Sequence, residues 1–90
     1  MPEQPTQGVS GSTYQAPYRP SSDCILGEYI VGFYPKYTIE QHFAFLGREF
    51  EIMDMLTNGY GAKMDDDLFN RVRSDRGVKY VEDNCRGEYL

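Results

Sequence analysis

The sequence contains no tryptophan, only one histidine and two cysteines, and no long apolar run. Zinc sites use about four His, Cys or carboxylate ligands at close spacing, so one histidine and two distant cysteines argue against zinc. No apolar stretch approaches the roughly 18 residues that cross a bilayer. No Gly-rich loop has phosphate-binding spacing. We therefore expect no metal, no cofactor and no membrane span.

Positive charge is also scarce, with 9 Lys and Arg against 14 Asp and Glu and a formal net charge of -5. Proteins that bind a phosphate backbone usually carry a basic stripe. Here the only dense charge run is acidic, Asp65-Asp66-Asp67. Neither nucleic acid nor an anionic membrane is expected as a partner, and the free chain is expected to be a monomer.

Residues 1–23 are rich in Pro, Gly, Ser, Thr and Gln, which predicts a flexible N-terminal arm before a domain that spans 24–90. Tyr14 and Tyr18 are interpreted as solvated rather than docked. The first residues lack the charged and apolar regions of a secretory signal, which predicts a cytoplasmic protein. If Met1 was added to a mature fragment and the cysteines are bridged, the protein is instead secreted.

The first half of the domain predicts a strand followed by a helix. Residues 29–33 are apolar, β-branched and aromatic, as in a strand. Thr38 and Gln41 have the spacing of a capping box, and Gly47 is a plausible C-terminal stop. These signals predict a helix over 38–46.

The second half predicts a hairpin, a helix and a strand. Residues 50–56 and 60–64 are expected to pair around an Asn58-Gly59 turn with positive φ. Asp65 is expected to cap a helix that Gly77 ends, and 78–82 form the last strand. The order β-α-β-β-α-β predicts an α+β, ferredoxin-like fold: a four-stranded antiparallel sheet with both helices on one face.

In that fold the first and last strands are neighbours. Pairing Val31 with Val78 brings Cys24 opposite Cys85, close enough for a disulfide. Two reduced thiols are the alternative, favoured by the lack of a signal sequence. From the sequence both states stay open.

The sequence does not predict an enzyme. His42 is expected to be a structural residue of the first helix, beside Phe43. Glu82 and Asp83 are adjacent in a strand, so their side chains point to opposite faces and suit a general acid/base pair poorly.

Three segments resemble the inhibitor I9 family, which comprises the propeptides of subtilisin-like serine proteases and free-standing relatives such as the fungal proteinase B inhibitors. They are the strand 29–33, the return 59–64 and the run from Met64 to Asp83. The most specific part is the end of that run, Gly-Val-Lys-Tyr-Val-Glu-Asp. The resemblance covers about residues 29–84.

The resemblance implies a partner, a subtilisin-like serine protease, and a mode of binding. Family members pack the open sheet face on the protease, and the segment after the last strand lies in the substrate cleft like a cleaved product. That segment includes Arg86, Gly87, Glu88, Tyr89 and Leu90 in this sequence. Either Leu90 or Tyr89 would fill the primary specificity pocket, whereas Gly87 departs from the apolar residue usual at its position.

The resemblance also implies that Glu82 and Asp83 approach the N-termini of protease helices, where a carboxylate meets free N–H groups. The alternative is that both are solvated acids at the end of a strand and contact no protease. The leading hypothesis is a free inhibitor of subtilisin-like proteases. The alternatives are an excised propeptide that assists folding and a ferredoxin-like binding module without inhibitory activity.

Overall fold

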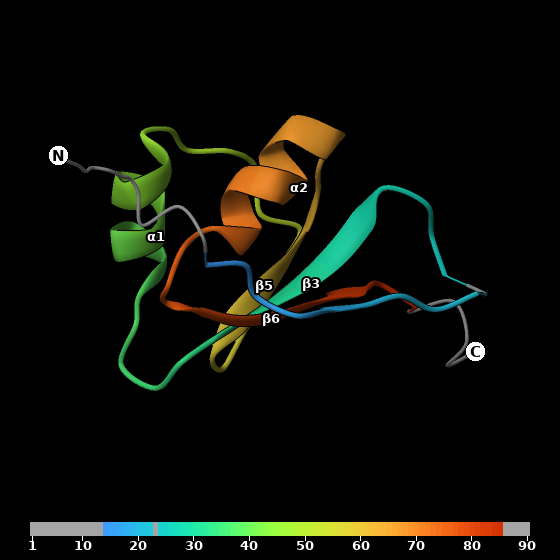
Figure 1. The fold of residues 1–90 in the computed structure, drawn as a ribbon, viewed down its shortest axis with the longest axis horizontal. Helices are drawn as coiled ribbons and strands as arrows, with labels where there is room; N and C mark the ends of the chain where they lie inside the picture. Colours follow the sequence, from blue (N-terminus) through green and yellow to red (C-terminus); the bar gives the residue numbers. More distant parts are fainter. Residues whose placement is uncertain (1–13, 23, 86–90) are drawn as a thin grey trace, which may run out of the picture.

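The computed structural model describes residues 14–22 and 24–85. Its strands form one sheet in the order β2-β6-β3-β5-β4, and both helices lie on the same side of that sheet (Figure 1). The elements are β2 (Tyr18–Arg19), β3 (Glu28–Phe33), α1 (Ile39–Leu46), β4 (Asp54–Leu56), β5 (Gly59–Lys63), α2 (Asp66–Arg73) and β6 (Val78–Asp83).

The sheet confirms the predicted α+β class but not the predicted four-stranded antiparallel sheet. It has a fifth strand, β2, which runs parallel to β6, so the sheet is mixed. The pairs β6–β3, β3–β5 and β5–β4 are antiparallel. Strand β2 comes from the segment that was predicted to be a flexible arm.

The docked part of the arm has a strand-like alternation that its composition hides. Tyr14, Ala16 and Tyr18 are spaced by two and pack against the core. Ala16 is fully buried, its N–H donates to the Arg73 carbonyl at 2.8 Å, and the Arg73 Nε donates back to the Ala16 carbonyl at 2.9 Å. The Tyr14 hydroxyl donates to the Val78 carbonyl at 2.6 Å. The interpretation of both tyrosines as solvated was therefore wrong.

Helix α1 follows the predicted local signals. The Thr38 hydroxyl accepts from the Gln41 N–H at 3.1 Å, and the Gln41 side chain accepts from the Thr38 N–H at 3.0 Å. Gly47 closes the helix with φ of 76°, a left-handed conformation that glycine adopts without a steric penalty. The capping box and the stop at Gly47 are confirmed.

Helix α2 begins as predicted and ends earlier. The Asp65 carboxylate accepts from the Leu68 N–H at 2.8 Å, but the helix ends at Arg73 with Ser74 as its cap. The prediction that Gly77 ends it was wrong. Gly77 has a different function, because a Cβ at this position would overlap the ring of Tyr37.

The predicted hairpin is present with a shorter first strand and a different turn. Residues 50–53 are not in a strand, and a two-residue turn joins Leu56 to Gly59. Among the described residues, positive φ occurs only at Gly27, Lys36 and Gly47, so the turn does not use the positive φ predicted at Asn58-Gly59. Glycine is required at 59 because a Cβ there would collide with the Val31 carbonyl oxygen.

The predicted register between β3 and β6 was wrong by three residues. Val31 pairs with Val81, and Phe33 pairs with Val78 after a shift between Gly32 and Phe33. Either register places Val31 opposite another valine, so the apolar pattern alone could not choose between them. The irregularity lets both Val78 and Val81 face the core, where both are fully buried.

The core fills the space between the helices and one face of the sheet. Tyr60 is the largest fully buried side chain and contacts the rings of Phe33, Phe50 and His42. Because β3 alternates, Val31 and Phe33 point into this core and Ile30 and Gly32 point to the other face. Neither helix covers that second face, which lies on the opposite side of the sheet (Figure 1).

Candidate functional site

A shallow groove of about 590 Å³ lies on the face of the sheet opposite the helices. Its lining comes from β2 and the residues after it, from Ile30 of β3, from β4, and from the end of β6 through Cys85. No residue of α1 or α2 contributes. We call this surface the open-face groove.

Two glycines on the open face of the sheet leave room for side chains of neighbouring strands. A Cβ on Gly32 would overlap the ring of Tyr80, so that ring lies across the glycine. A Cβ on Gly61 would be 3.2 Å from the Ile30 Cδ1 and 3.6 Å from an Asp54 carboxylate oxygen. Side chains from neighbouring strands therefore lie flat over the glycines, and the face can approach a large partner closely.

Apolar and acidic groups share this face. Leu56, which lies on the same side of β4 as Asp54, is 44% exposed at this edge of the sheet. Glu82 pairs with Ile30, Ile30 with Gly61, and Gly61 with Asp54, so the two acids stand in one row across the sheet. Three strand spacings of about 4.8 Å separate their backbones by roughly 14 Å. The groove thus has an apolar floor between two carboxylates.

The acids Glu82 and Asp83 have different surroundings. Asp83 accepts from the Tyr18 hydroxyl at 2.5 Å and from the Ser21 N–H at 2.7 Å, so both of its oxygens are occupied by the arm. The hydrogen bond to Asp83, with burial, raises the pKa of Tyr18 to about 12. Glu82 lies on the open side, 3.8 Å from Arg19, with its side chain 39% exposed. Of these two acids, Glu82 is the one available to a partner on the open face.

Cys24 and Cys85 form a disulfide. The register that suggested this pair is wrong, and a turn brings the two residues together instead. The Glu28 N–H donates to the Ile25 carbonyl at 3.2 Å around Gly27, whose φ is 82°, and the Ile25 N–H donates to the Asn84 carbonyl at 3.0 Å. This fixes Cys85 at one end of the groove.

The tail residues of the sequence prediction lie outside the described residues. Chain 86–90, which includes Arg86, Gly87, Glu88, Tyr89 and Leu90, continues directly from the bridged Cys85. The end of β6 and the segment that leads into β3 extend past the two helices (Figure 1). The last described residue before the tail is therefore at the rim of the open-face groove.

A buried polar pair next to the disulfide was not anticipated from the sequence. The Asn84 amide donates to the Glu28 carboxylate at 3.4 Å, and the two residues are only 3% and 7% exposed. The Asn84 N–H also donates to the Glu28 carbonyl at 2.9 Å. These contacts hold the end of β6 against the start of β3.

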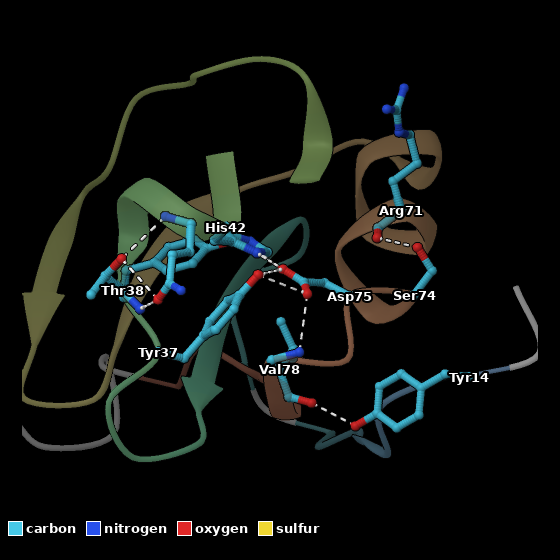
Figure 2. A network of polar contacts seen from close by, with 11 residues as sticks. Tyr14, Tyr37, Thr38, His42, Arg71, Ser74, Asp75 and Val78 are labelled. Atoms are coloured by element: carbon cyan, nitrogen blue, oxygen red, sulfur yellow. Dashed lines mark hydrogen bonds and ion pairs between the residues drawn. The ribbon is translucent and has the colours of Figure 1, made fainter. Parts of the chain in front are cut away.

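His42 belongs to a hydrogen-bonded network in the core rather than to the groove. Its Nδ1 is 2.7 Å from the Asp75 carboxylate and its Nε2 is 2.8 Å from the Tyr60 hydroxyl. Tyr37 also donates to Asp75, at 2.7 Å; Figure 2 shows Tyr37 and His42 converging on this carboxylate. His42 has no exposed surface, so a substrate cannot reach it and the network stabilises the fold.

The protonation states follow from the environment of Asp75. Burial tends to raise the pKa of Asp75, but hydrogen bonds from His42, Tyr37 and the Gly77 N–H outweigh it and lower the pKa. Burial, with the charge of Asp75, raises the pKa of the Tyr60 hydroxyl. The network is complete when Tyr60 donates to Nε2 of His42 and the Nδ1–H of His42 donates to Asp75.

Other kinds of site were also considered. Within 14–22 and 24–85, no cluster of three or more His, Cys, Asp or Glu side chains is arranged to hold a metal ion. None of the helices in these ranges is both long and apolar enough to cross a membrane. The open-face groove is the candidate site because Cys85, from which the chain continues into residues 86–90, lines it.

Comparison with known proteins adds no assignment. No protein-family model matches the sequence, and no curated protein matches it either.

Proposed function

We propose that this chain inhibits subtilisin-like serine proteases by docking its open sheet face on the protease and inserting residues 86–90 into the substrate cleft like a product. The observation that supports this most is the position of Cys85. It is pinned by the disulfide at the rim of the open-face groove, one step before the tail begins.

The physical advantage of this arrangement is preorganisation. An extended segment binds a cleft through its main chain, and alternate side chains enter pockets. Ordering such a segment costs conformational entropy, which a folded support reduces. Strand β6 and the bridge to Cys24 fix the chain up to residue 85, so the folded support reaches the residue directly before the proposed tail.

The sheet supports the same proposal. Strands β6, β3, β5 and β4 are antiparallel neighbours in this order, with both helices on one side, as in a ferredoxin-like βαββαβ unit. In this proposal β2 is an addition at the outer edge of β6. It leaves the face opposite the helices free for a partner.

The two acids then take separate roles. We assign Glu82 to the protease, where its carboxylate meets free N–H groups at a helix N-terminus. Asp83 instead anchors the arm through Tyr18 and Ser21. The disulfide favours a secreted protein, because such bonds persist in oxidising compartments.

The test is a titration of the intact chain into subtilisin or proteinase K with a chromogenic peptide substrate. We expect tight competitive inhibition. Deleting residues 86–90 should weaken it by about two orders of magnitude, or roughly 3 kcal/mol. A deletion of residues 1–5 removes the same length from the other end and should leave inhibition unchanged.

Two results would contradict the proposal in different ways. Inhibition that survives deletion of the tail would remove the product-like mechanism while keeping an inhibitor. No inhibition of any subtilisin-like protease by the intact chain would favour the non-inhibitory binding module. Mass spectrometry of each mixture identifies inhibitor lost to cleavage, which follows local opening of the fold.

A further inference from the structure

Strand β2 places one cation on the open face. Arg19 pairs with Glu82 in the parallel β2–β6 ladder, and its guanidinium lies 4.5 Å above the centre of the Tyr80 ring. The same Tyr80 ring lies across Gly32 at the centre of the face. Stacking on an aromatic ring is a favourable position for a guanidinium. Arg19 is therefore held at the rim of the open-face groove by two neighbours on β6.

The Arg19 guanidinium is oriented, yet none of its donors forms a hydrogen bond with residues 14–22 or 24–85. Its closest carboxylate oxygen, on Glu82, is 3.8 Å from Nη1, which is an ion pair but too long for a hydrogen bond. In the described parts of the chain the guanidinium makes no hydrogen bond, and the side chain is 62% exposed. A guanidinium has five N–H donors in a planar fork that matches the two oxygens of a carboxylate.

The charge around Arg19 is of the opposite sign. Glu82 and Asp54 line the same groove, and the whole chain carries a formal net charge of -5. A partner surface that is only basic would match these acids but would be repelled by Arg19. A complementary partner presents an acidic group opposite Arg19, because like charges brought together at an interface cost several kcal/mol.

We propose that Arg19 determines which protease is bound, by pairing with a carboxylate on the protease surface that docks on the open face. Strand β2 then widens the docking surface by one strand. This inference rests on the proposed inhibitor function and adds a residue from the arm, a segment outside the part of the chain that resembles the inhibitor family. Its chemistry requires an Asp or Glu of the protease within reach of Arg19.

The experiment compares inhibition constants of Arg19 variants against the subtilisin-like protease that the intact chain inhibits best. Loss of a charge-assisted pair predicts an inhibition constant about tenfold higher for Arg19→Ala. Arg19→Lys should recover only part of this, because an ammonium neither stacks flat nor binds two oxygens. Arg19→Glu should raise the constant most, by about 100-fold at low salt.

Arg76→Ala is the matched control. Arg76 is also exposed and lies 5.5 Å above an aromatic ring, that of Tyr14, but it does not line the groove. Arg76→Ala removes the same charge and the same kind of stacking contact as Arg19→Ala, but away from the groove. The inhibition constant of this variant should therefore equal that of the intact chain. The difference between Arg19→Ala and Arg76→Ala should shrink at high salt, which screens an exposed ion pair.

Hydrogen exchange distinguishes the loss of a contact with the protease from detachment of the arm from the sheet. The Val81 N–H donates to the Pro17 carbonyl at 2.9 Å and therefore reports whether the arm is still docked. Weaker inhibition with Val81 still protected supports the proposal. Weaker inhibition with Val81 protection lost overturns it, because the arm has then detached. Equal constants for Arg19→Ala and Arg76→Ala also overturn it, while the inhibitor function stands; if the intact chain inhibits no protease, both proposals fail.

Discussion

Replacing Tyr60 by phenylalanine removes one oxygen atom from the centre of the core and changes little of its shape. Tyr60 and His42 are both without exposed surface, and the hydroxyl is 2.8 Å from the Nε2 of His42. The other ring nitrogen of His42 is already bonded to Asp75. In the variant, Nε2 is left without a partner in a place that water does not reach.

The expected cost follows from that unpaired atom. A buried polar group that loses its partner costs about 1–3 kcal/mol, so we expect Tyr60→Phe to lower the free energy of unfolding by about 2 kcal/mol. A chain of 90 residues has a typical stability of roughly 5–13 kcal/mol. The melting temperature should fall by about 10 °C.

Urea unfolding followed by circular dichroism at pH 7 measures the effect. The matched control is Tyr80→Phe, since within the described residues the Tyr80 hydroxyl has no hydrogen bond and its ring lies on the open face. We expect this control to change stability by less than about 0.5 kcal/mol. If Tyr60→Phe costs no more than Tyr80→Phe, the reasoning about the His42 network is wrong.

Three further predictions concern other parts of the fold. Replacing both bridged cysteines by serine should lower the free energy of unfolding by about 4 kcal/mol, from the chain-entropy estimate for a sequence separation of 61. Urea unfolding measures this difference, and a loss below about 1 kcal/mol would show that the bridge adds little. Gly59→Ala should lower the free energy of unfolding by about 3 kcal/mol, because the new Cβ would clash with the Val31 carbonyl. Gly27→Ala has open space around the new Cβ but a φ of 82°, so it should cost only about 1 kcal/mol. Thermal melts that reverse this order would count against the account of Gly59. The pKa of Asp75 is lowered in the folded state from 3.8, so its stabilisation is present above about pH 4 and is lost as the pH falls through the folded value. The stability difference between the wild type and Asp75→Asn should therefore shrink from pH 6 to pH 2.5, and a difference independent of pH would contradict the assigned charge.

Local signals in the sequence predicted local structure well. Thr38, Gln41 and Gly47 act within one helix, and their positions fixed both ends of α1. Asp65 likewise fixed the start of α2. Gly77 misled because its role depends on contact with Tyr37, which is forty residues earlier in the chain. A glycine that ends a helix and a glycine that makes room for a ring look the same in a sequence.

Features that depend on distant residues were harder to predict. The hydrogen-bonded network joins His42 of α1, Tyr60 of β5 and Asp75, which follows α2. No regular spacing in the sequence relates these three residues. The arm was predicted to be flexible from its composition, although the alternation of Tyr14, Ala16 and Tyr18 is the signal for a strand that composition obscured. Arg19, as part of β2, was missed for the same reason.

The position of the disulfide also determines what a proteolytic cut would do to the chain. The bridge joins Cys24 to Cys85, so both helices and every strand from β3 to β6 lie between the two bonded residues. A single cut in that interval, for example in the exposed 47–49 segment, produces two fragments that remain covalently attached. The fragments keep a high effective concentration for each other, so they can refold together after a cut. A cleaved molecule would then persist as a two-chain protein that separates only when the bridge is reduced.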